Sequence, residues 1–207
     1  VHILKEYLNL LDPQLSVEKF PPQFDTSENW IEKHLKSFQK PLPESYLVLT
    51  PGAVYGPAKQ WPLEHFRSLA AQMIQLFGTS ILILGTAEDA ESGAEISQGI
   101  EGVHNYCGQT TLTEFLAILA KANLLIGNDS GSMHLMGALQ RPQIALFGST
   151  SPTWTAPVNP HASVLSRNLS CSPCFARTCR YGHYDCLTKI QPELVLQEAQ
   201  KILSTKN

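Results

Sequence analysis

The segment from Pro51 to Pro62 combines two glycines with a lysine between a predicted strand and a predicted helix. Gly52 and Gly56 let the backbone approach a ligand closely, and Lys59 places a mobile cation near the entrance of such a site. This combination suits a phosphate or a diphosphate. A tight turn that carries a solvated lysine fits the spacing equally well. The Walker pattern of a P-loop is absent, which disfavours hydrolysis of nucleoside triphosphates.

A second segment, 127–135, ends a predicted strand and begins a predicted helix. Asp129 and Ser130 are residue types that cap helices, and the free N–H groups of Gly131 and its two successors would point at a ligand above the helix. Exposed donors and the helix dipole both favour an anion at that place. The alternative is that Asp129 or Ser130 only caps the helix and that His134 is a structural histidine.

Two acidic residues follow the second predicted strand, in the stretch Gly85-Thr86-Ala87-Glu88-Asp89. A carboxylate at the end of such a strand can accept hydrogen bonds from a ribose diol. The alternative, which the sequence favours, is that Glu88 and Asp89 stand in the first turn of a helix and complement its dipole. The stretch is therefore a candidate ribose contact with a strong structural alternative.

Four cysteines stand close together near the C-terminal end: Cys171, Cys174, Cys179 and Cys186. With His183 among them they could clip a loop around zinc, but the spacing matches neither a paired C-x2-C ribbon nor a common iron–sulfur run. Disulfides would need an oxidising compartment, for which the sequence carries no signal. Zinc binding and reduced or conditionally oxidised thiols therefore stay equal alternatives. Cys107, at a strand end, is predicted to be a core residue.

These segments lie in an alternating pattern of strands and helices that begins at Tyr46. Short β-branched or leucine-rich runs predict strands at 46–50, 80–84, 103–106, 124–126 and 143–147, with a weaker one at 163–165. Helices are predicted at 63–77, 87–100, 112–122 and 132–139, and a last one from Pro192 to about Leu203. The alternation is typical of an α/β domain with a parallel sheet, which binds ligands at the carboxyl ends of its strands.

The first 44 residues contain five prolines and show no convincing core pattern. One amphipathic helix is predicted from Asn29 to Phe38. The chain begins at Val1 rather than Met. We therefore expect a lead-in whose packing partner is missing, and a chain that is a fragment of a longer protein.

Composition limits the classes of protein that this chain can belong to. Of 207 residues, 43% are apolar and 16% are charged, which indicates a folded chain with an extensive core. The net charge of -3 gives no basic field, so we expect no nucleic-acid partner. No apolar run approaches the roughly 18 residues of a membrane span, and no secretory signal is present, so we expect a soluble protein.

Taken together, four motifs resemble those of the bacterial lipopolysaccharide heptosyltransferases, over about residues 46–203. The first motif is Pro51-Gly-Ala-x-Tyr-Gly-Pro-Ala-Lys-x-Trp-Pro62, and the second is Gly108-x-Thr-x-Leu112. The third is Asn128-Asp-Ser-Gly-x-Met-His134. The fourth is Arg141-Pro-x-Ile-Ala-Leu-Phe-Gly148, which leads into Ser151-Pro152.

The resemblance implies a GT-B architecture, in which two Rossmann-like domains face each other across a cleft, each a parallel sheet with helices on both faces. Residues 45–207, including the cysteine-bearing loop 171–186, would form the C-terminal domain that binds the nucleotide sugar. Residues 1–44 would be the lead-in and interdomain segment. The N-terminal acceptor domain, which supplies the aspartate proposed as catalytic base in the family, would be absent, so we expect this chain alone to be inactive.

The resemblance also implies an activity: inverting transfer of heptose from ADP-heptose to the lipopolysaccharide inner core. The acceptor would bind through the missing domain, in the cytoplasm or peripherally at the inner face of the inner membrane. No divalent metal is required, because a lysine and a helix N-terminus can oppose the diphosphate charge. The alternatives are another GT-B enzyme, such as a nucleotide-sugar epimerase, and a metal or redox module built on the four cysteines.

Carried over motif by motif, Lys59 and Asp129 become the catalytic candidates. Lys59 would bind the donor phosphates and stabilise the leaving ADP, and Asp129 would lie near the heptose. Ser130 and Gly131 would lie under the diphosphate, while one of the acidic pair and the neighbourhood of Thr110 would face ribose and adenine. The further donor-binding candidates are Gly52, Ala53, Tyr55, Gly56, Gly85, Thr86, Glu88, Asp89, Asn128, Met133 and His134.

Overall fold

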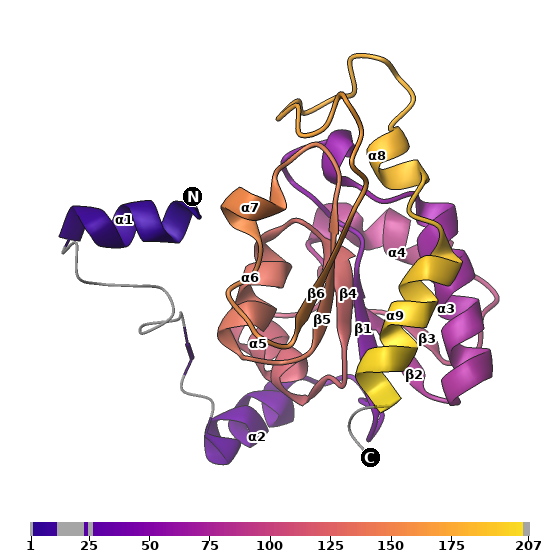
Figure 1. Cartoon of the computed structure of the whole chain (residues 1–207). Coiled ribbons are helices and arrows are strands. Elements are labelled where there is room, and N and C mark those ends of the chain that lie inside the picture. Colours follow the sequence, from indigo (N-terminus) through magenta and orange to yellow (C-terminus); the bar gives the residue numbers. More distant parts are fainter. Residues whose placement is uncertain (1, 12–22, 25–26, 205–207) are drawn as a thin grey trace.

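A six-stranded parallel sheet forms the centre of the protein, in the order β3-β2-β1-β4-β5-β6 (Figure 1). The computed structural model describes residues 2–11, 23–24 and 27–204. Its strands are β1 (Tyr46–Thr50), β2 (Ser80–Ile83), β3 (Val103–Asn105), β4 (Leu125–Asn128), β5 (Gln143–Phe147) and β6 (Ala162–Ser166). The predicted α/β fold with a parallel sheet is confirmed.

Helices connect successive strands, and further helices precede β1 and follow β6. They are α1 (Ile3–Leu11), α2 (Glu28–Ser37), α3 (Leu63–Phe77), α4 (Ala90–Ser97), α5 (Leu112–Lys121), α6 (Gly131–Ala138), α7 (Pro152–Thr155), α8 (Asp185–Thr188) and α9 (Pro192–Ser204), with 3-10 turns η1 (Pro57–Lys59) and η2 (Ala87–Asp89). Within the described part of the chain, no helix has the length and apolar character that crossing a bilayer requires.

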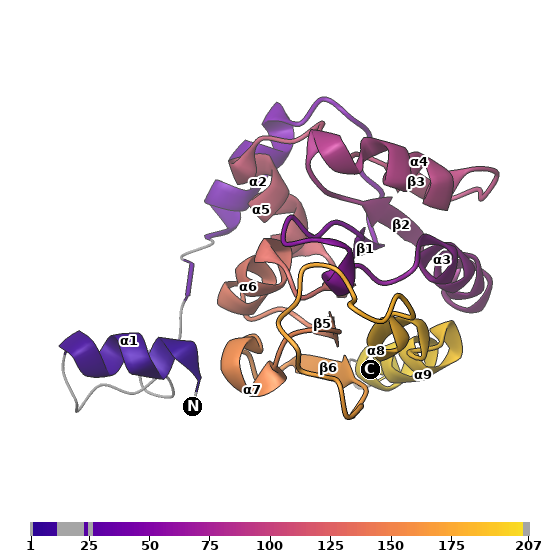
Figure 2. The same cartoon turned by 90° about the horizontal axis from the view of Figure 1, so that it is seen from above.

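The sheet is covered by helices on both faces (Figure 2). Successive side chains of a strand point to opposite faces, so each strand contributes to two cores. In β1, Leu47 and Leu49 pack with residues of α3 and α9, while Tyr46 and Val48 pack with residues of α2, α5 and α6. All five residues of β1 are buried, as expected for a central strand of a parallel sheet.

Helix α2 belongs to the second of these cores. Ile31 and Phe38 are buried there, and an ion pair between Lys121 and Glu28 joins α5 to α2. The expectation that residues 1–44 have no packing partner is therefore wrong for this helix. Helix α1 was not predicted. The residue before this helix contacts the sheet domain, because His2 Nε2 lies 2.9 Å from the carbonyl oxygen of Ala156. Three of the five prolines of the lead-in, Pro13, Pro21 and Pro22, lie outside the described residues.

The helix predicted over 87–100 forms as two shorter pieces. Thr86 and Asp89 bond reciprocally in a capping box that starts η2, and α4 follows at Ala90. The chain leaves α4 at Gln98, which has an extended ψ of 117°, and turns at Gly99, whose φ is 69°. Glycine adopts such a positive φ without a steric penalty, so the helix ends three residues earlier than its apolar pattern suggests.

Candidate functional site

The site lies where the order of the strands reverses. From β1 the chain continues to β2 and β3 at one edge of the sheet, and from β4 it continues to β5 and β6 at the other. Such a switch point opens a crevice at the carboxyl ends of the strands. A cavity of about 740 Å³ occupies this place, between the loops that follow β1, β2 and β4 and the first turns of α5 and α6. Ligand cavities commonly measure roughly 300–1,000 Å³.

The cavity unites segments that the sequence singled out separately. The predicted residues that line it are Gly52, Ala53, Tyr55, Lys59, Gly85, Thr86, Asp89, Thr110, Asp129, Ser130, Gly131 and His134. The Lys59 loop, which we define as residues 51–60, and the start of α6 therefore share one hollow. Contacts between these residues and a donor stay predictions.

Lys59 is not the mobile cation that the sequence suggested. Its Nζ lies 2.6 Å from Asp129 Oδ2, and the two side chains are only 13% and 3% exposed. Thr150 Oγ1 donates a hydrogen bond of 2.5 Å to the same carboxylate oxygen. The ammonium group also lies 4.8 Å from the centre of the Tyr55 ring. Asp129 thus holds Lys59 at a fixed place in the wall of the cavity.

Helix α6 begins without a side-chain cap. Ser130 is the N-cap residue, but its side chain makes no capping hydrogen bond. Its Oγ lies 2.9 Å from Ser132 Oγ, which donates to Thr50 Oγ1 at 3.0 Å. Because the capping alternative for Ser130 is not realised and the Asp129 carboxylate is bound to Lys59, the helix start is open to an anion.

Of the two acidic residues after β2, only Asp89 lines the cavity. Its Oδ2 accepts hydrogen bonds from the Thr86 backbone N–H at 2.8 Å and from Thr86 Oγ1 at 3.0 Å. Glu88 is exposed and lies outside the cavity wall, so the prediction that it faces a bound ribose is not met by its position. Asp89 therefore has a structural role in the first turn of η2, as the alternative that the sequence favoured predicted.

Asn128 lies behind the cavity rather than in its wall. Its fully buried side chain accepts a hydrogen bond from the Trp61 backbone N–H at 3.0 Å and donates one to the Pro51 carbonyl at 2.6 Å. These two bonds fix Pro51, the first residue of the Lys59 loop, and Trp61, the residue after it, to the end of β4. Asn128 is thus a structural residue of the site, and the prediction of a direct donor contact does not fit its position.

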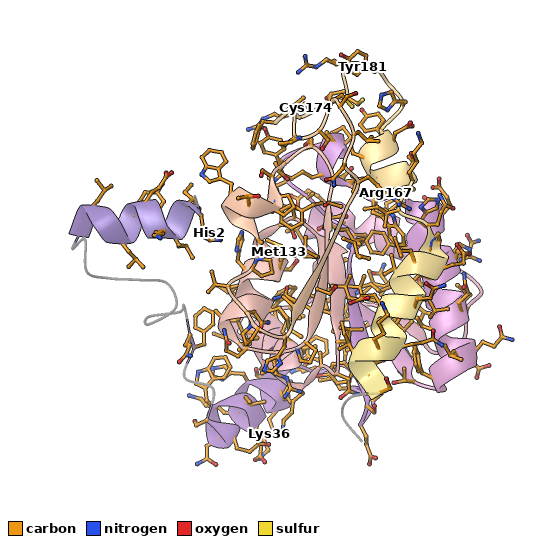
Figure 3. The ribbon with its side chains drawn as sticks, in the orientation of Figure 1. His2, Lys36, Met133, Arg167, Cys174 and Tyr181 are labelled. Carbon is orange, nitrogen blue, oxygen red and sulfur yellow. The ribbon has the colours of Figure 1, made fainter. Side chains whose placement is uncertain are left out.

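Met133 and Gly56 also lie outside the cavity wall, contrary to their predicted donor contact. Met133 is 1% exposed and packs with Ala145 and Phe147 inside the domain (Figure 3). Gly56 has a φ of 140°, and a Cβ at this position would come within 2.7 Å of the Arg177 carbonyl oxygen. Its glycine character serves the close approach of another loop, not of a ligand.

Sequence reasoning missed the apolar wall of the cavity. Leu84, Leu112, Phe115 and Leu135 supply this wall. Leu112, the first residue of α5, is 66% exposed, and no signal in the sequence distinguished it from the buried leucines of that helix. Apolar side chains of this kind suit the flat ring of a nucleobase. The other lining residues that were missed are Thr50, Val54, Ala87, Gly108, Thr111, Ser132 and Thr155.

His134 stands at the mouth of the cavity, one turn into α6. The residue is exposed, and the protein atoms beside its ring lower its pKa. The nearby His2 and Lys59 lower this pKa further, and Asp129 opposes them. The imidazole is therefore neutral near pH 7, where it can accept or donate a hydrogen bond.

The four clustered cysteines line a separate cavity of about 20 Å³. All of the cysteines are free, and Cys107 is buried as predicted, which raises the pKa of its thiol to about 12. Across residues 2–11, 23–24 and 27–204, no group of three or more His, Cys, Asp or Glu side chains is arranged to hold a metal ion. The predicted zinc site thus receives no support from the arrangement of these thiols.

Known sequences resemble this chain along most of its length. A sequence model described as glycosyltransferase family 9 (heptosyltransferase) matches residues 1–185. Lipopolysaccharide heptosyltransferase 2 of Salmonella typhimurium is 32% identical over 188 residues, which are 88% of this chain and 54% of the relative. Lipooligosaccharide heptosyltransferase 2 of Campylobacter jejuni is 34% identical over 179 residues, which are 82% of this chain and 56% of the relative.

Solved structures resemble it as well. The structure of Escherichia coli ADP-heptose lps heptosyltransferase II superposes with a TM-score of 0.82 at 28% identity, over 99% of this chain and 62% of that one. The glycosyl transferase family 9 protein of Veillonella parvula gives a TM-score of 0.81 at 25% identity, over 99% of this chain and 60% of that one. The fold matches that of these GT-B glycosyltransferases. The chain spans about half the length of the curated relatives it matches.

Proposed function

Because the chain belongs to glycosyltransferase family 9, the heptosyltransferases, as its motifs predicted, we propose that its cavity binds the ADP-heptose donor of such an enzyme. The observation that carries the proposal is that Lys59 and the uncapped start of α6 line the same cavity. The negative charge of a diphosphate between them would be stabilised both by the ammonium group and by the N–H donors of the helix. The proposal needs no divalent metal for this purpose.

The apolar wall supports a site for the adenine ring. Leu84, Leu112 and Phe115 would cover the faces and edge of the base, where apolar burial is favourable. Thr110 and Asp89 border the same region and would meet the ribose hydroxyls. One oxygen of Asp89 already accepts two hydrogen bonds from Thr86, so its other oxygen is the proposed acceptor.

Lys59 is the proposed catalytic residue in this chain. When the bond between the anomeric carbon and the diphosphate breaks, negative charge grows on the leaving ADP, and a fixed ammonium group stabilises that charge more than it stabilises the bound donor. Asp129 was predicted to lie near the heptose. Its Oδ2 lies 2.6 Å from Lys59 Nζ, so we propose that it mainly holds the ammonium group in place. We assign no general base to the described residues.

We propose that the base and the binding site for the lipopolysaccharide inner core belong to an N-terminal acceptor domain. The support is the length of the relatives, of which this chain covers about half. In this proposal residues 45–207, together with α2, form the donor-binding domain of an inverting enzyme that works in the cytoplasm, at the inner face of the inner membrane. This chain alone would bind donor without transferring heptose.

Zinc at the four cysteines stays an alternative that the sequence leaves open, without support from the arrangement of the thiols in the described part of the chain. Elemental analysis of the purified chain measures it directly, and stoichiometric zinc would support a structural metal. The alternative functions have no support in the comparisons: neither a nucleotide-sugar epimerase nor a non-enzymatic metal or redox module is proposed.

A calorimetric panel tests the donor proposal. We expect ADP-heptose and ADP to bind the folded chain more tightly than UDP, GDP or UDP-sugars, because the apolar wall fits adenine. Leu112→Ala should weaken ADP binding by about 1 kcal/mol through lost apolar burial. The matched control is Leu76→Ala, since Leu76 is another exposed helical leucine and lies outside the cavity. A preference for UDP-sugars, or no ADP binding by folded protein, would contradict the proposal.

A further inference from the structure

The loop that carries the four cysteines lies directly against the Lys59 loop. Cys174 and Tyr181 mark it at the upper end of the molecule (Figure 3), and Figure 2 shows it passing beside the turn that follows β1. The cavity of about 20 Å³ that the four thiols line is also bordered by Ala58, the residue before Lys59. We call residues 171–186 the cysteine loop.

Backbone hydrogen bonds join the two loops. The Ala58 N–H donates to the Arg177 carbonyl at 3.0 Å, and the Tyr55 hydroxyl donates to the Phe175 carbonyl at 2.5 Å. The Arg177 guanidinium lies 5.0 Å from the centre of the Tyr55 ring, the same ring that Lys59 contacts. The Lys59 loop therefore takes part of its shape from the cysteine loop.

A third segment, after β5, locks the arrangement. The carbonyl of Ser149 accepts hydrogen bonds from the N–H groups of Cys174 at 3.0 Å and Phe175 at 2.7 Å. The Ser149 N–H in turn donates to the Ala58 carbonyl at 3.2 Å. A Cβ on Gly148 would come within 2.7 Å of that same Ala58 oxygen. Because the three backbones are in such close contact, a shift of the cysteine loop must move Ala58 and its neighbour Lys59.

The thiols differ in their readiness to react. Cys179 is partly exposed, and backbone N–H groups of 181–184, that of Tyr184 above all, lower its pKa. Burial raises the pKa of Cys186, and the neighbouring Cys174, Cys179 and Cys171 raise it further. Cys171, Cys174 and Cys179 are partly exposed whereas Cys186 is buried, so oxidation would begin at one of the three accessible thiols and be completed by a neighbour in the same cavity.

We propose that the cysteine loop is a positioning element of the donor site, and that its four free thiols form an oxidation site through which this position is lost. The oxidant class is a hydroperoxide. A cysteine sulfur attacks the O–O bond, becomes a sulfenic acid and releases water or an alcohol. A second thiol then attacks this sulfur, forms a disulfide and releases water. Two thiols lose two electrons and two protons, and the peroxide takes up both.

The inference rests on the proposed donor site, because its consequence is a change in donor binding. A disulfide among the four cysteines must pull their sulfur atoms to bonding distance, which displaces backbone at 174–179 and with it the carbonyl groups that hold Tyr55 and Ala58. Lys59 then no longer faces the diphosphate. The loss should fall on ADP and spare adenosine, which carries no phosphate.

The experiment compares the reduced chain with the chain treated with hydrogen peroxide. Mass spectrometry of non-reduced peptides should find a disulfide within the cysteine loop. Calorimetry should find ADP binding weakened by about tenfold or more, the loss of one charged hydrogen bond, with adenosine binding unchanged. Dithiothreitol should restore ADP binding. The variant in which all four loop cysteines are replaced by serine should resist the treatment, whereas Cys107→Ser, the buried control, should respond like the unaltered chain.

A second readout does not depend on any ligand. Hydrogen exchange at the Ala58 amide should become faster on oxidation, because its acceptor is the Arg177 carbonyl. Failure of the reduced chain to bind ADP would count against the donor site, while the exchange rate would still test the coupling of the two loops. Unchanged exchange and ADP affinity in a chain with a mapped loop disulfide would overturn the inference, as would stoichiometric zinc on these thiols or oxidation confined to Cys107.

Discussion

The ion pair with Asp129 explains how the ammonium group of Lys59 is stabilised in a largely buried site. A lone ammonium group at 13% exposure would lose much of its hydration, and the carboxylate at 2.6 Å compensates for that loss. Thr150 adds a hydrogen bond to the carboxylate and so fixes its orientation. A diphosphate that enters the cavity meets a charge already in position, and little free energy is needed to order it.

Breaking this pair should be costly, whereas removing both charges should not. We expect Asp129→Asn to lower the free energy of unfolding by about 3 kcal/mol, because it leaves the Lys59 charge without its partner. The double variant Lys59→Met/Asp129→Asn should return to within about 1 kcal/mol of the unaltered chain, since no uncompensated charge remains. Urea unfolding of each purified variant measures these values.

The control is the exposed pair of Lys121 and Glu28. Glu28→Gln removes a carboxylate at 64% exposure, and we expect a loss below about 1 kcal/mol. If Asp129→Asn cost no more than Glu28→Gln, the pair would be solvated and Lys59 would not be fixed by it.

At the level of single residues, the sequence predicted which loops border the cavity better than which side chains line it. The loops after β1 and β4 were both identified from their glycines, caps and lysine. The contact between Lys59 and Asp129 was not, because loop position does not determine the distance between two side chains. Asn128 and Met133 lie inside the same motif as Asp129 but point into the protein, and residue type alone does not give that direction.

Helix α5 shows how a local signal shapes one side of the cavity. Thr111 Oγ1 accepts a hydrogen bond from the Glu114 backbone N–H at 3.3 Å, and Glu114 Oε2 accepts one from the Thr111 backbone N–H at 2.8 Å. This capping box satisfies two N–H groups that would otherwise lack partners. It also fixes the start of the helix, so that Leu112 and Phe115 line the cavity.

Loss of this cap should destabilise the chain measurably. We expect Thr111→Ala to lower the free energy of unfolding by about 1 kcal/mol, because the Glu114 N–H loses its acceptor. Thr153→Ala is the matched control, since Thr153 is an exposed threonine in α7 that does not cap the helix. Chemical denaturation compares the two, and equal losses would show that the box adds no stability.

The elements that the sequence predicted well are those with a long apolar pattern. Helix α3 runs from Leu63 to Phe77 as expected and stops at Gly78, whose φ of 61° suits a glycine. Helices α7 and α8 have four residues each, too few for a repeating pattern to appear. Helix α4 was predicted too long because Thr86 and Asp89, side chains that suit a cap, start a 3-10 turn instead of a regular helix.

In the whole molecule, the order of the strands creates the site. Parallel pairing and alternation were predictable, but each connection in the sequence is compatible with a new strand on either side of the last. The observed order makes β1 and β4 neighbours, through pairs such as Leu49 with Ile126. Their loops then open into one cavity. A sheet with these two strands apart would have separated Lys59 from the start of α6.

The central claim is that Lys59 and the start of α6 hold a diphosphate, and one calorimetric comparison tests it. ADP and adenosine are titrated into the unaltered chain and into Lys59→Met/Asp129→Asn, with Lys121→Ala as a control outside the cavity. We predict that the unaltered chain prefers ADP, and that the double variant loses about 1.5–3 kcal/mol of ADP binding while adenosine binding stays unchanged. Equal affinities for ADP and adenosine in the unaltered chain, or equal ADP affinity in both proteins, would contradict the claim.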